Sequence, residues 1–332
     1  MTDAAVTEAA VLEVRDLTVE FRSSGVWHPA VRGVAFAIAR NETLAVVGES
    51  GSGKSVTALA VMGLVPAESG RIAAGSSIRL DGKELVGLPE RALDRVRGDR
   101  VAMIFQEPMT ALNPTMTVGA QVAEGVRAHR GMGAAAAWKE AQRVLDLVKV
   151  PSAAKRMSDY PHQFSGGMRQ RVMIAMALAC QPAVLLADEP TTALDVTIQA
   201  QVLSLMADLK REYGLGILFI THNLGVVALI ADRVAVMYAG EIVETATAAA
   251  LFDAPRHPYT EALLASMPRV DRDIGSLEPI QGNVPSIRDI GIGCAFAPRC
   301  AQAQPKCHAE RPTLSAIAPE RTVRCWVRGG AA

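Results

Sequence analysis

Residues 48–55, GESGSGKS, combine glycines, a lysine and a serine in an order that suits phosphate binding. The three glycines allow backbone angles that turn successive N–H groups inward, and such groups form a nest for anionic oxygens. Lys54 is long enough to reach terminal phosphates, and the Ser55 hydroxyl can ligate Mg²⁺. A strand-like run precedes the segment and a helix-like run follows it, so the positive helix end adds to the nest. The predicted nucleotide-phosphate site comprises Gly48, Glu49, Ser50, Gly51, Ser52, Gly53, Lys54 and Ser55.

Two adjacent carboxylates, Asp188 and Glu189, end the apolar run AVLLA. Open α/β sheets present ligands at the carboxyl ends of their strands. Asp188 can hold Mg²⁺ through water, and Glu189 can polarise an attacking water, which is a contribution of roughly 10²–10⁴-fold for a placed general base. Two solvated acids at a strand end are common in isolation, but the phosphate loop favours phosphate hydrolysis here.

A second glycine-rich helix start lies at FSGGMRQR, residues 164–171. Ser165, Gly166 and Gly167 would open this helix, so its N-terminus is another candidate for binding an anion. In isolation, a Gly-Gly helix start is as often only a cap. Because the phosphate loop and the acid pair occur in the same chain, we interpret this helix start as an anion-binding site.

The elements that must position these segments are strands alternating with helices. Residues 11–47 read as strands, residues 117–180 as mainly helical, and a hairpin near residue 240 closes the pattern. The pattern predicts an α/β domain with a largely parallel sheet, interrupted by an all-helical insertion. After about residue 265 proline becomes frequent and periodicity disappears, which predicts a separate irregular extension.

Composition excludes several classes of protein. Lys plus Arg and Asp plus Glu both total 34, so the neutral chain offers no electrostatic footprint for nucleic acid. The acidic, alanine-rich N-terminus does not resemble a signal peptide, and no apolar run reaches the 18 or so residues of a spanning helix. The sequence predicts a soluble cytosolic protein.

The order of the three segments resembles that of ABC-type ATPases, and the resemblance covers residues 11 to about 260. SGGMRQ resembles the family signature. The resemblance implies an α/β fold: a P-loop ABC ATPase core with a mostly parallel sheet, an antiparallel β subdomain and a helical signature subdomain at about 112–180. We expect a nucleotide-binding domain at 1–265 and a C-terminal extension with four cysteines at 266–332. A phosphate-loop kinase would lack the signature.

The resemblance also assigns residues outside the phosphate loop. Gln106 resembles the glutamine that links Mg²⁺ and water to the helical subdomain, and His222 resembles the histidine that contacts the terminal phosphate. Phe21 sits where the family places an aromatic ring against adenine, a contact worth about 1–3 kcal/mol, and Trp27 is a weaker candidate. The implied ATP contacts are Phe21, Gln106, Ser165, Gly166, Gly167, Gln170, Asp188, Asp195 and His222; the catalytic residues are Glu189, His222 and Gln106; and the Mg²⁺ ligands are Ser55, Gln106 and Asp188.

Family architecture implies partners. Two ATPase domains meet head to tail, and each ATP lies between one phosphate loop and the other subunit's signature helix. ALD at 193–195 resembles the loop through which the two subunits sense each other. Because this chain has one copy of each segment, it needs a second ATPase subunit, which we expect to be a related chain forming a heterodimer.

Two stretches indicate the transporter class. Residues 105–119 resemble the segment that faces the membrane subunits in importers of oligopeptides and dipeptides, and HPYTEALL, GNVPS and GCAFAPRCAQAQPKC resemble the C-terminal extension of those subunits. Ala301, and GIG before the first cysteine of the extension, depart from the common pattern. The resemblance implies an ATPase at the cytoplasmic face of the cell membrane, with two transmembrane permease subunits and, indirectly, an extracytoplasmic substrate-binding protein. Alternatives are an importer of nickel or another small solute, and a soluble non-transport ABC ATPase.

Four cysteines crowd the extension with the spacing C-x₅-C-x₆-C-x₁₇-C: Cys294, Cys300, Cys307 and Cys325. In a reducing cytosol such thiols are more plausibly metal ligands than disulfides. The spacing is wider than in common zinc sites and does not match ferredoxins. Some relatives with this tail resemble iron–sulfur proteins, so we favour a structural [4Fe–4S] cluster, with zinc or free thiols as alternatives. Cys180, alone in an apolar run, is expected to be core.

Overall fold

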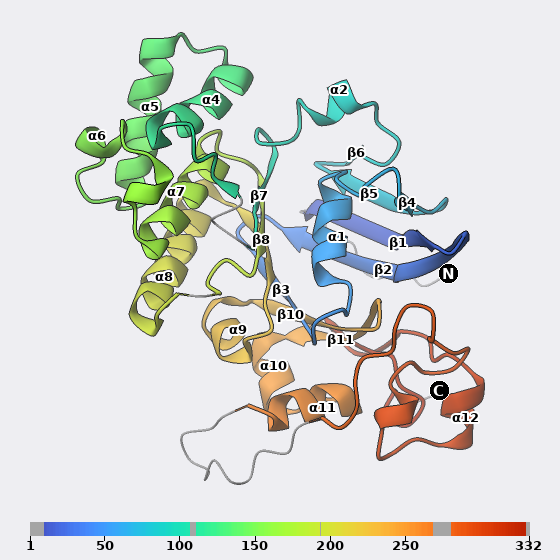
Figure 1. Ribbon diagram of the computed structural model, residues 1–332. Helices are drawn as coiled ribbons and strands as arrows, with labels where there is room; N and C mark the ends of the chain where they lie inside the picture. The colour runs from blue at the N-terminus through green and yellow to red at the C-terminus, as the bar shows by residue number, and fades with distance from the viewer. Residues whose placement is uncertain (1–9, 107–110, 193, 268–279, 330–332) are drawn as a thin grey trace. The chain divides into compact units, whose positions relative to one another are not determined.

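The computed structural model describes residues 10–106, 111–192, 194–267 and 280–329 (Figure 1). The chain folds into two compact units. The helical unit comprises residues 1–12, 38–42 and 87–219 of the chain, and the phosphate-loop unit comprises residues 13–37, 43–86 and 220–332. The extension that begins after residue 265 therefore shares a compact unit with the phosphate loop.

In the helical unit, β7 (Val101–Ile104) and β8 (Val184–Asp188) pair in parallel, and the unit also contains most of β9 (Gly216–Ile220). All five residues of β8 and of β9 are buried, as expected for strands that are covered on both faces. The strand order in this unit is β9-β8-β7. β7 and β8 therefore end side by side, where the predicted catalytic residues follow.

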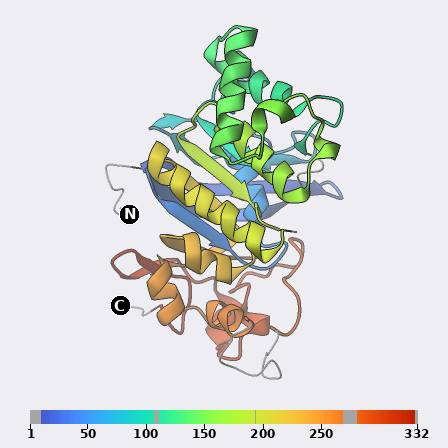
Figure 2. The same ribbon diagram turned by 90° about the vertical axis from the view of Figure 1, so that its left-hand side faces the viewer.

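Helices make up most of the helical unit. α4 (Val118–Arg130) and α5 (Ala134–Leu147) pack together, and both contact α7 (Gly166–Leu178); the pair is green in Figures 1 and 2. Thr117 caps α4 by accepting a hydrogen bond from the N–H of Ala120. The buried residues of α5 recur every three or four positions, as an amphipathic helix requires. The remaining elements are α2 (Glu90–Leu93), α6 (Ala153–Arg156), the 3₁₀ helix η1 (Pro161–Gln163) and α8 (Val196–Tyr213).

The phosphate-loop unit carries two sets of strands. One has the order β2-β1-β5-β6 with β4 paired to β1, and the other has the order β12-β13-β11-β10-β3. β3 and β10 are parallel, whereas β10 and β11 form the predicted closing hairpin. Their bounds are β1 (Ala10–Ser23), β2 (Val26–Ala39), β3 (Thr43–Val47), β4 (Gly70–Ile72), β5 (Ser77–Leu80), β6 (Lys83–Glu84), β10 (Arg233–Tyr238), β11 (Glu241–Thr247), β12 (Ser315–Ala318) and β13 (Arg321–Val323).

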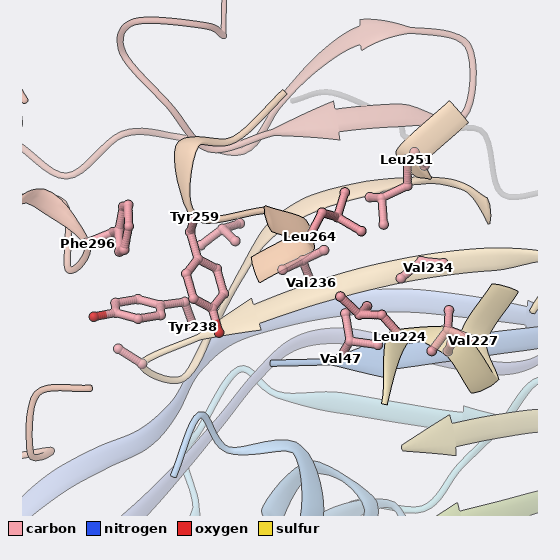
Figure 3. Close-up of a cluster of buried hydrophobic side chains, with 14 residues drawn as sticks. Val47, Leu224, Val227, Val234, Val236, Tyr238, Leu251, Tyr259, Leu264 and Phe296 are labelled. Carbon is pink, nitrogen blue, oxygen red and sulfur yellow. The ribbon is translucent and has the colours of Figure 1, made fainter. Parts of the chain in front are cut away.

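Helices of this unit are α1 (Lys54–Val61), α9 (Leu224–Ile230), α10 (Ala248–Asp253), α11 (Pro258–Ala265), the 3₁₀ helix η3 (Ala297–Arg299) and α12 (Pro305–Ala309). Their core is a cluster of buried side chains around β10 that includes Tyr238, Tyr259 and Phe296 (Figure 3). Because Phe296 belongs to the extension, the extension shares this core.

The extension contains two strands that the sequence did not predict. β13 pairs with β11 through Glu244 and Val323, and β12 pairs with β13. Both strands are short and lack a clear apolar alternation, so their pairing depends on the partner strand. No helix within the described parts of the chain is long and apolar enough to cross a membrane.

Candidate nucleotide site and four-cysteine cavity

The phosphate loop follows β3 and leads into α1, in the context that its sequence demands. Gly48 has φ 154°, and a Cβ there would lie 2.1 Å from the carbonyl oxygen of Met237. Gly53 has φ 102°, and its Cβ would lie 2.9 Å from the carbonyl oxygen of Ala30. Side chains are thus excluded at both positions, because the loop backbone lies directly against neighbouring backbone.

Lys54 lies within the loop and is only 7% exposed. Its ammonium donates to the carbonyl oxygens of Gly48 and Glu49, at 2.9 Å each, and to Ser52 Oγ at 3.3 Å. The positive charge is therefore held at the centre of the loop. This position suits the binding of phosphate oxygens.

Phe21 and His222, both in the phosphate-loop unit, have different surroundings. Phe21 is half-buried on β1, where it pairs with Gly70 of β4. His222 is exposed and precedes Asn223, whose side chain caps α9 by accepting from two backbone N–H groups. Trp27 already stacks with Arg71, whose guanidinium carbon lies 4.2 Å from the ring centroid.

Gln106 and Glu189 meet in the helical unit, at the ends of β7 and β8. Gln106 Nε2 donates to Glu189 Oε2 at 3.2 Å, and Thr192 Oγ1 donates to the same oxygen at 2.9 Å. The backbone of Glu189 has φ 47°, a left-handed conformation that is costly for a residue with a side chain and that clusters at functional sites. Asp188, the residue before it, is 5% exposed. Thr192 is a contact that the sequence reading missed, although it lies only three residues after Glu189.

Signature residues and Asp195 line one groove of about 990 Å³ in the helical unit. Ser165 is the N-cap residue of α7, and Asp195 caps α8 by accepting from the N–H of Ile198 at 2.9 Å. A Cβ at Gly167 would lie 2.7 Å from Ile198 Cγ2, so this glycine lets the two helix starts approach. Gln170 is 3% exposed, and its Nε2 has no hydrogen-bond partner among the described residues.

The predicted site residues thus form separate sets. Phosphate loop, Phe21 and His222 belong to the phosphate-loop unit, whereas Gln106, the acid pair and the signature belong to the helical unit. Of the segment at 105–119, residues 107–110 lie outside the described residues, as does Ala193 of the ALD segment.

All four cysteines of the extension line one small cavity of about 10 Å³, together with His257, Phe296 and Trp326. The N–H of Cys294 donates to the carbonyl oxygen of Cys307 at 2.7 Å, and the N–H of Gln304 donates to Cys307 Sγ at 3.5 Å. Burial raises the pKa of the Cys294 and Cys300 thiols, and the neighbouring thiols raise it further. The structure therefore brings together the four cysteines that the sequence grouped.

The cysteine side chains lie around one cavity but are not arranged as the ligands of a metal ion. All five cysteines are free, and within the described parts of the chain no group of three or more His, Cys, Asp or Glu side chains is arranged to hold a metal ion. Cys180 is buried in the helical unit, where its thiol donates to the carbonyl oxygen of Gly125 at 3.5 Å. It is a core residue, as predicted.

His257 is a wall of this cavity that the sequence reading missed. It is 1% exposed, and its Nδ1 accepts from the N–H of Tyr259 at 3.0 Å. Burial is the main cause that lowers its pKa from 6.5 to about 3, so the ring is neutral. A lone histidine before a proline gave no signal of this burial.

Comparisons with known proteins agree with these features. Residues 31–192 match the family described as "ABC transporter", and residues 243–307 match "Oligopeptide/dipeptide transporter, C-terminal region". The ATP-binding cassette MJ0796, in a dimeric post-hydrolysis state bound to ADP and Pi, has a TM-score of 0.64 at 26% identity, covering 71% of this chain and 98% of that one. The α/β fold predicted for an ABC ATPase is confirmed.

Relatives extend over nearly the whole chain. The oligopeptide transport ATP-binding protein AppD of Bacillus subtilis is 51% identical, covering 96% of this chain and 97% of its own. OppD of Salmonella typhimurium is also 51% identical, covering 95% and 93%, and the dipeptide transport ATP-binding protein DppD of B. subtilis is 48% identical, covering 96% and 95%. This chain therefore belongs to the ATP-binding subunits of the oligopeptide and dipeptide ABC transporter family.

Proposed function

We propose that this chain hydrolyses ATP to energise the import of oligopeptides or dipeptides. The observation that carries hydrolysis is the contact between Gln106 and Glu189, reinforced by Thr192. Two hydrogen bonds to one oxygen fix the orientation of the carboxylate that is to accept a proton from water. A base held in this way is suited to general-base catalysis.

The other site residues take the following roles. The phosphate loop and Lys54 bind the phosphates of ATP, Ser55 and Asp188 bind Mg²⁺ with Gln106, and Phe21 stacks against adenine. His222 contacts the terminal phosphate. Phosphoryl transfer needs little covalent chemistry from the protein, so positioning and charge stabilisation by these groups account for most of the catalysis.

The signature groove serves a second subunit. Ser165, Gly166, Gly167, Gln170 and Asp195 bind the ATP held on the phosphate loop of the partner, so closure of the two subunits assembles both sites. The open groove supports this role, as does the amide nitrogen of Gln170, which has no hydrogen-bond partner in the part of the chain that the structure describes. The second ATPase subunit is a related chain, and the pair acts on two transmembrane permeases at the cytoplasmic face of the membrane. An extracytoplasmic binding protein delivers the peptide.

The proposed domains are a nucleotide-binding domain at 1–265, with a helical subdomain at about 112–180, and an extension at 266–332. Peptides are favoured as cargo because the similarity to oligopeptide and dipeptide ATP-binding proteins includes the extension. An uptake assay in which the assembled transporter imports nickel or another small solute, and no peptide, would contradict this part of the proposal.

The extension is proposed to hold a [4Fe–4S] cluster through Cys294, Cys300, Cys307 and Cys325. The number of thiols around the cavity equals the usual number of ligands of such a cluster. Burial and mutual proximity disfavour the thiolates, and a bound cationic centre would offset this cost. When bound, the cluster would supply structural order to the extension.

Two measurements test the proposal. Glu189→Gln, assembled with the permeases, should bind ATP as the unaltered chain does and lose hydrolysis and peptide uptake together; normal hydrolysis would show that Glu189 is not the base. Anaerobically purified protein should be brown with about four irons per chain. Zinc, or no metal at all, would contradict the cluster and leave the ATPase proposal intact.

A further inference from the structure

We propose that Arg299 of the extension is a positioning residue for the phosphate loop, acting through Glu49. The inference rests on the proposed nucleotide site and adds a residue that no nucleotide-binding motif contains. It makes the affinity for nucleotide depend on how the cysteine-bearing extension is folded, because Arg299 directly precedes Cys300.

The contact between the two side chains is bidentate. Arg299 Nη1 donates to Glu49 Oε1 at 2.9 Å, and Arg299 Nη2 donates to Glu49 Oε2 at 3.1 Å. Paired charge-assisted hydrogen bonds of this kind fix direction as well as distance. The Arg299 side chain is only 6% exposed and that of Glu49 is 28% exposed, so solvent screens the pair less than it screens a surface ion pair.

Arg299 is itself held from several directions. Its Nε donates to the carbonyl oxygen of Gln281 at 2.8 Å, Nη2 donates to that of Ile280 at 3.2 Å, and Nη1 donates to Tyr238 Oη at 3.3 Å. The guanidinium also lies 5.7 Å from the ring centroid of Tyr238. With its donors occupied, this side chain cannot shift without breaking contacts inside the extension.

The backbone of Glu49 is held as well. Its N–H donates to Tyr259 Oη at 2.9 Å. Tyr259 packs against Tyr238 and Phe296, with ring centroids at 4.6 Å and 5.3 Å, in the buried cluster of Figure 3. Glu49 is thus fixed at its amide by α11 and at its carboxylate by the extension.

Glu49 passes this restraint to the inside of the loop. Its carbonyl oxygen accepts from Lys54 Nζ at 2.9 Å and from the N–H of Ser52 at 3.2 Å. A chain of short contacts therefore leads from Arg299 through Glu49 to the lysine that binds phosphate. Releasing the carboxylate of Glu49 lets this carbonyl turn, which moves both the lysine and the loop N–H groups away from their binding positions.

The extension supplies a matched control. Arg328 makes a second bidentate pair, with Glu261 of α11, at 2.6 and 3.1 Å. This pair also fixes the extension to its unit but involves no residue of the phosphate loop. Arg328→Gln therefore loses the same kind of contact as Arg299→Gln.

The test is the affinity of the purified full-length chain for MgADP, measured by isothermal titration calorimetry. Arg299→Gln should raise Kd about tenfold, as expected if part of a bidentate charge-assisted contact is transmitted to the loop. Arg299→Lys keeps the positive charge but cannot form the bidentate contact, so its Kd should lie between those of the unaltered chain and Arg299→Gln. The Kd of Arg328→Gln should be within about twofold of that of the unaltered chain. In the assembled transporter, Arg299→Gln should raise KM for ATP while kcat at saturation stays nearly unchanged, because Glu189 keeps its own hydrogen bonds.

Unchanged binding by Arg299→Gln would overturn the inference, and so would an equal loss in Arg328→Gln, which would indicate a general effect of extension folding. Should Arg299→Gln fail to fold, Glu49→Gln gives the same comparison from the loop side. If the unaltered chain binds no nucleotide, both the proposed function and this inference are overturned. If it binds nucleotide, the results for the variants test this inference alone.

Discussion

The phosphate loop and the four-cysteine cavity belong to one unit but depend on contacts of different range. Within the loop, Lys54 bonds to residues two, five and six positions away. The cavity walls come from segments between residues 257 and 327, and β13, which pairs with β11, lies directly before the last of these segments. The comparison indicates that the lysine of the loop is held by its own neighbours in sequence, with distant contacts added at Gly48, Glu49 and Gly53, whereas the cavity exists only when distant parts of the unit have assembled.

Substituting the buried Glu244 should have the largest effect on the long-range contacts that form the cavity. It is fully buried and accepts from the N–H groups of Arg256 and His257, at 2.9 and 2.7 Å, and from Arg321 at 3.1 Å. Glu244→Gln should lower the free energy of unfolding by about 3 kcal/mol, because it leaves Arg321, whose side chain is only 12% exposed, without its counter-charge. Urea titration followed by circular dichroism measures this loss.

Glu261→Gln is the control for that prediction. Its pair with Arg328 is partly exposed, with side-chain exposures of 35% and 29%. Such a pair contributes about 0–1 kcal/mol. Equal losses in the two variants would mean that burial does not distinguish the two ion pairs.

Gly48→Ala tests the phosphate-loop side of the comparison. Its Cβ would lie 2.1 Å from the carbonyl oxygen of Met237, so we expect ATP affinity to fall about 100-fold. Gly51 also has a positive φ, of 79°, but no atom lies within 4 Å of its Cβ position. Gly51→Ala should therefore weaken binding by only about tenfold, the effect of backbone strain alone. Similar Kd values for the two variants would argue that crowding against β10 is unimportant.

His257 makes the cavity side sensitive to acid. Its pKa in the folded chain is lowered to about 3, so the unfolded chain, with a value near 6.5, binds the proton first as pH falls. The stability contributed by the neutral ring is complete above pH 6.5 and is lost progressively toward pH 3, by about 2 kcal/mol at pH 5. Urea unfolding at pH 7.5 and 5.0 measures it. His257→Asn should show a smaller difference between the two pH values, and an unchanged difference would assign the acid sensitivity to other groups.

Thr192→Val should have the smallest effect. It removes one of the two hydrogen bonds to Glu189 Oε2 and leaves that from Gln106. We expect kcat to fall about fivefold with KM unchanged, a loss typical of one hydrogen bond. Steady-state ATPase assays of the assembled transporter measure it, and a rise in KM alone would place Thr192 in substrate binding.

The same contrast in range explains what the sequence could predict. The phosphate loop, the acid pair and the signature are contiguous motifs, and flanking apolar runs were sufficient to place them on strands and helices. Resemblance alone placed Gln106 in the site, and its contact with Glu189 was not predicted, because 83 residues separate them. The roles of Arg299, Glu244 and His257 had no local signal. Each depends on a partner that the fold brings from elsewhere in the chain.

β13 has a consequence for any shortened form of this chain. It pairs with β11, whose residues are mostly buried, and β12 then pairs with β13. Without β12 and β13, β11 would present unpaired N–H and C=O groups along a strand that is mostly buried in the full chain. Exposed edges of this kind pair with other chains and promote aggregation. Deleting the extension would therefore expose a sheet edge that promotes aggregation. Loss of soluble protein in a truncated form would follow from this edge and would not show that the cysteines are needed.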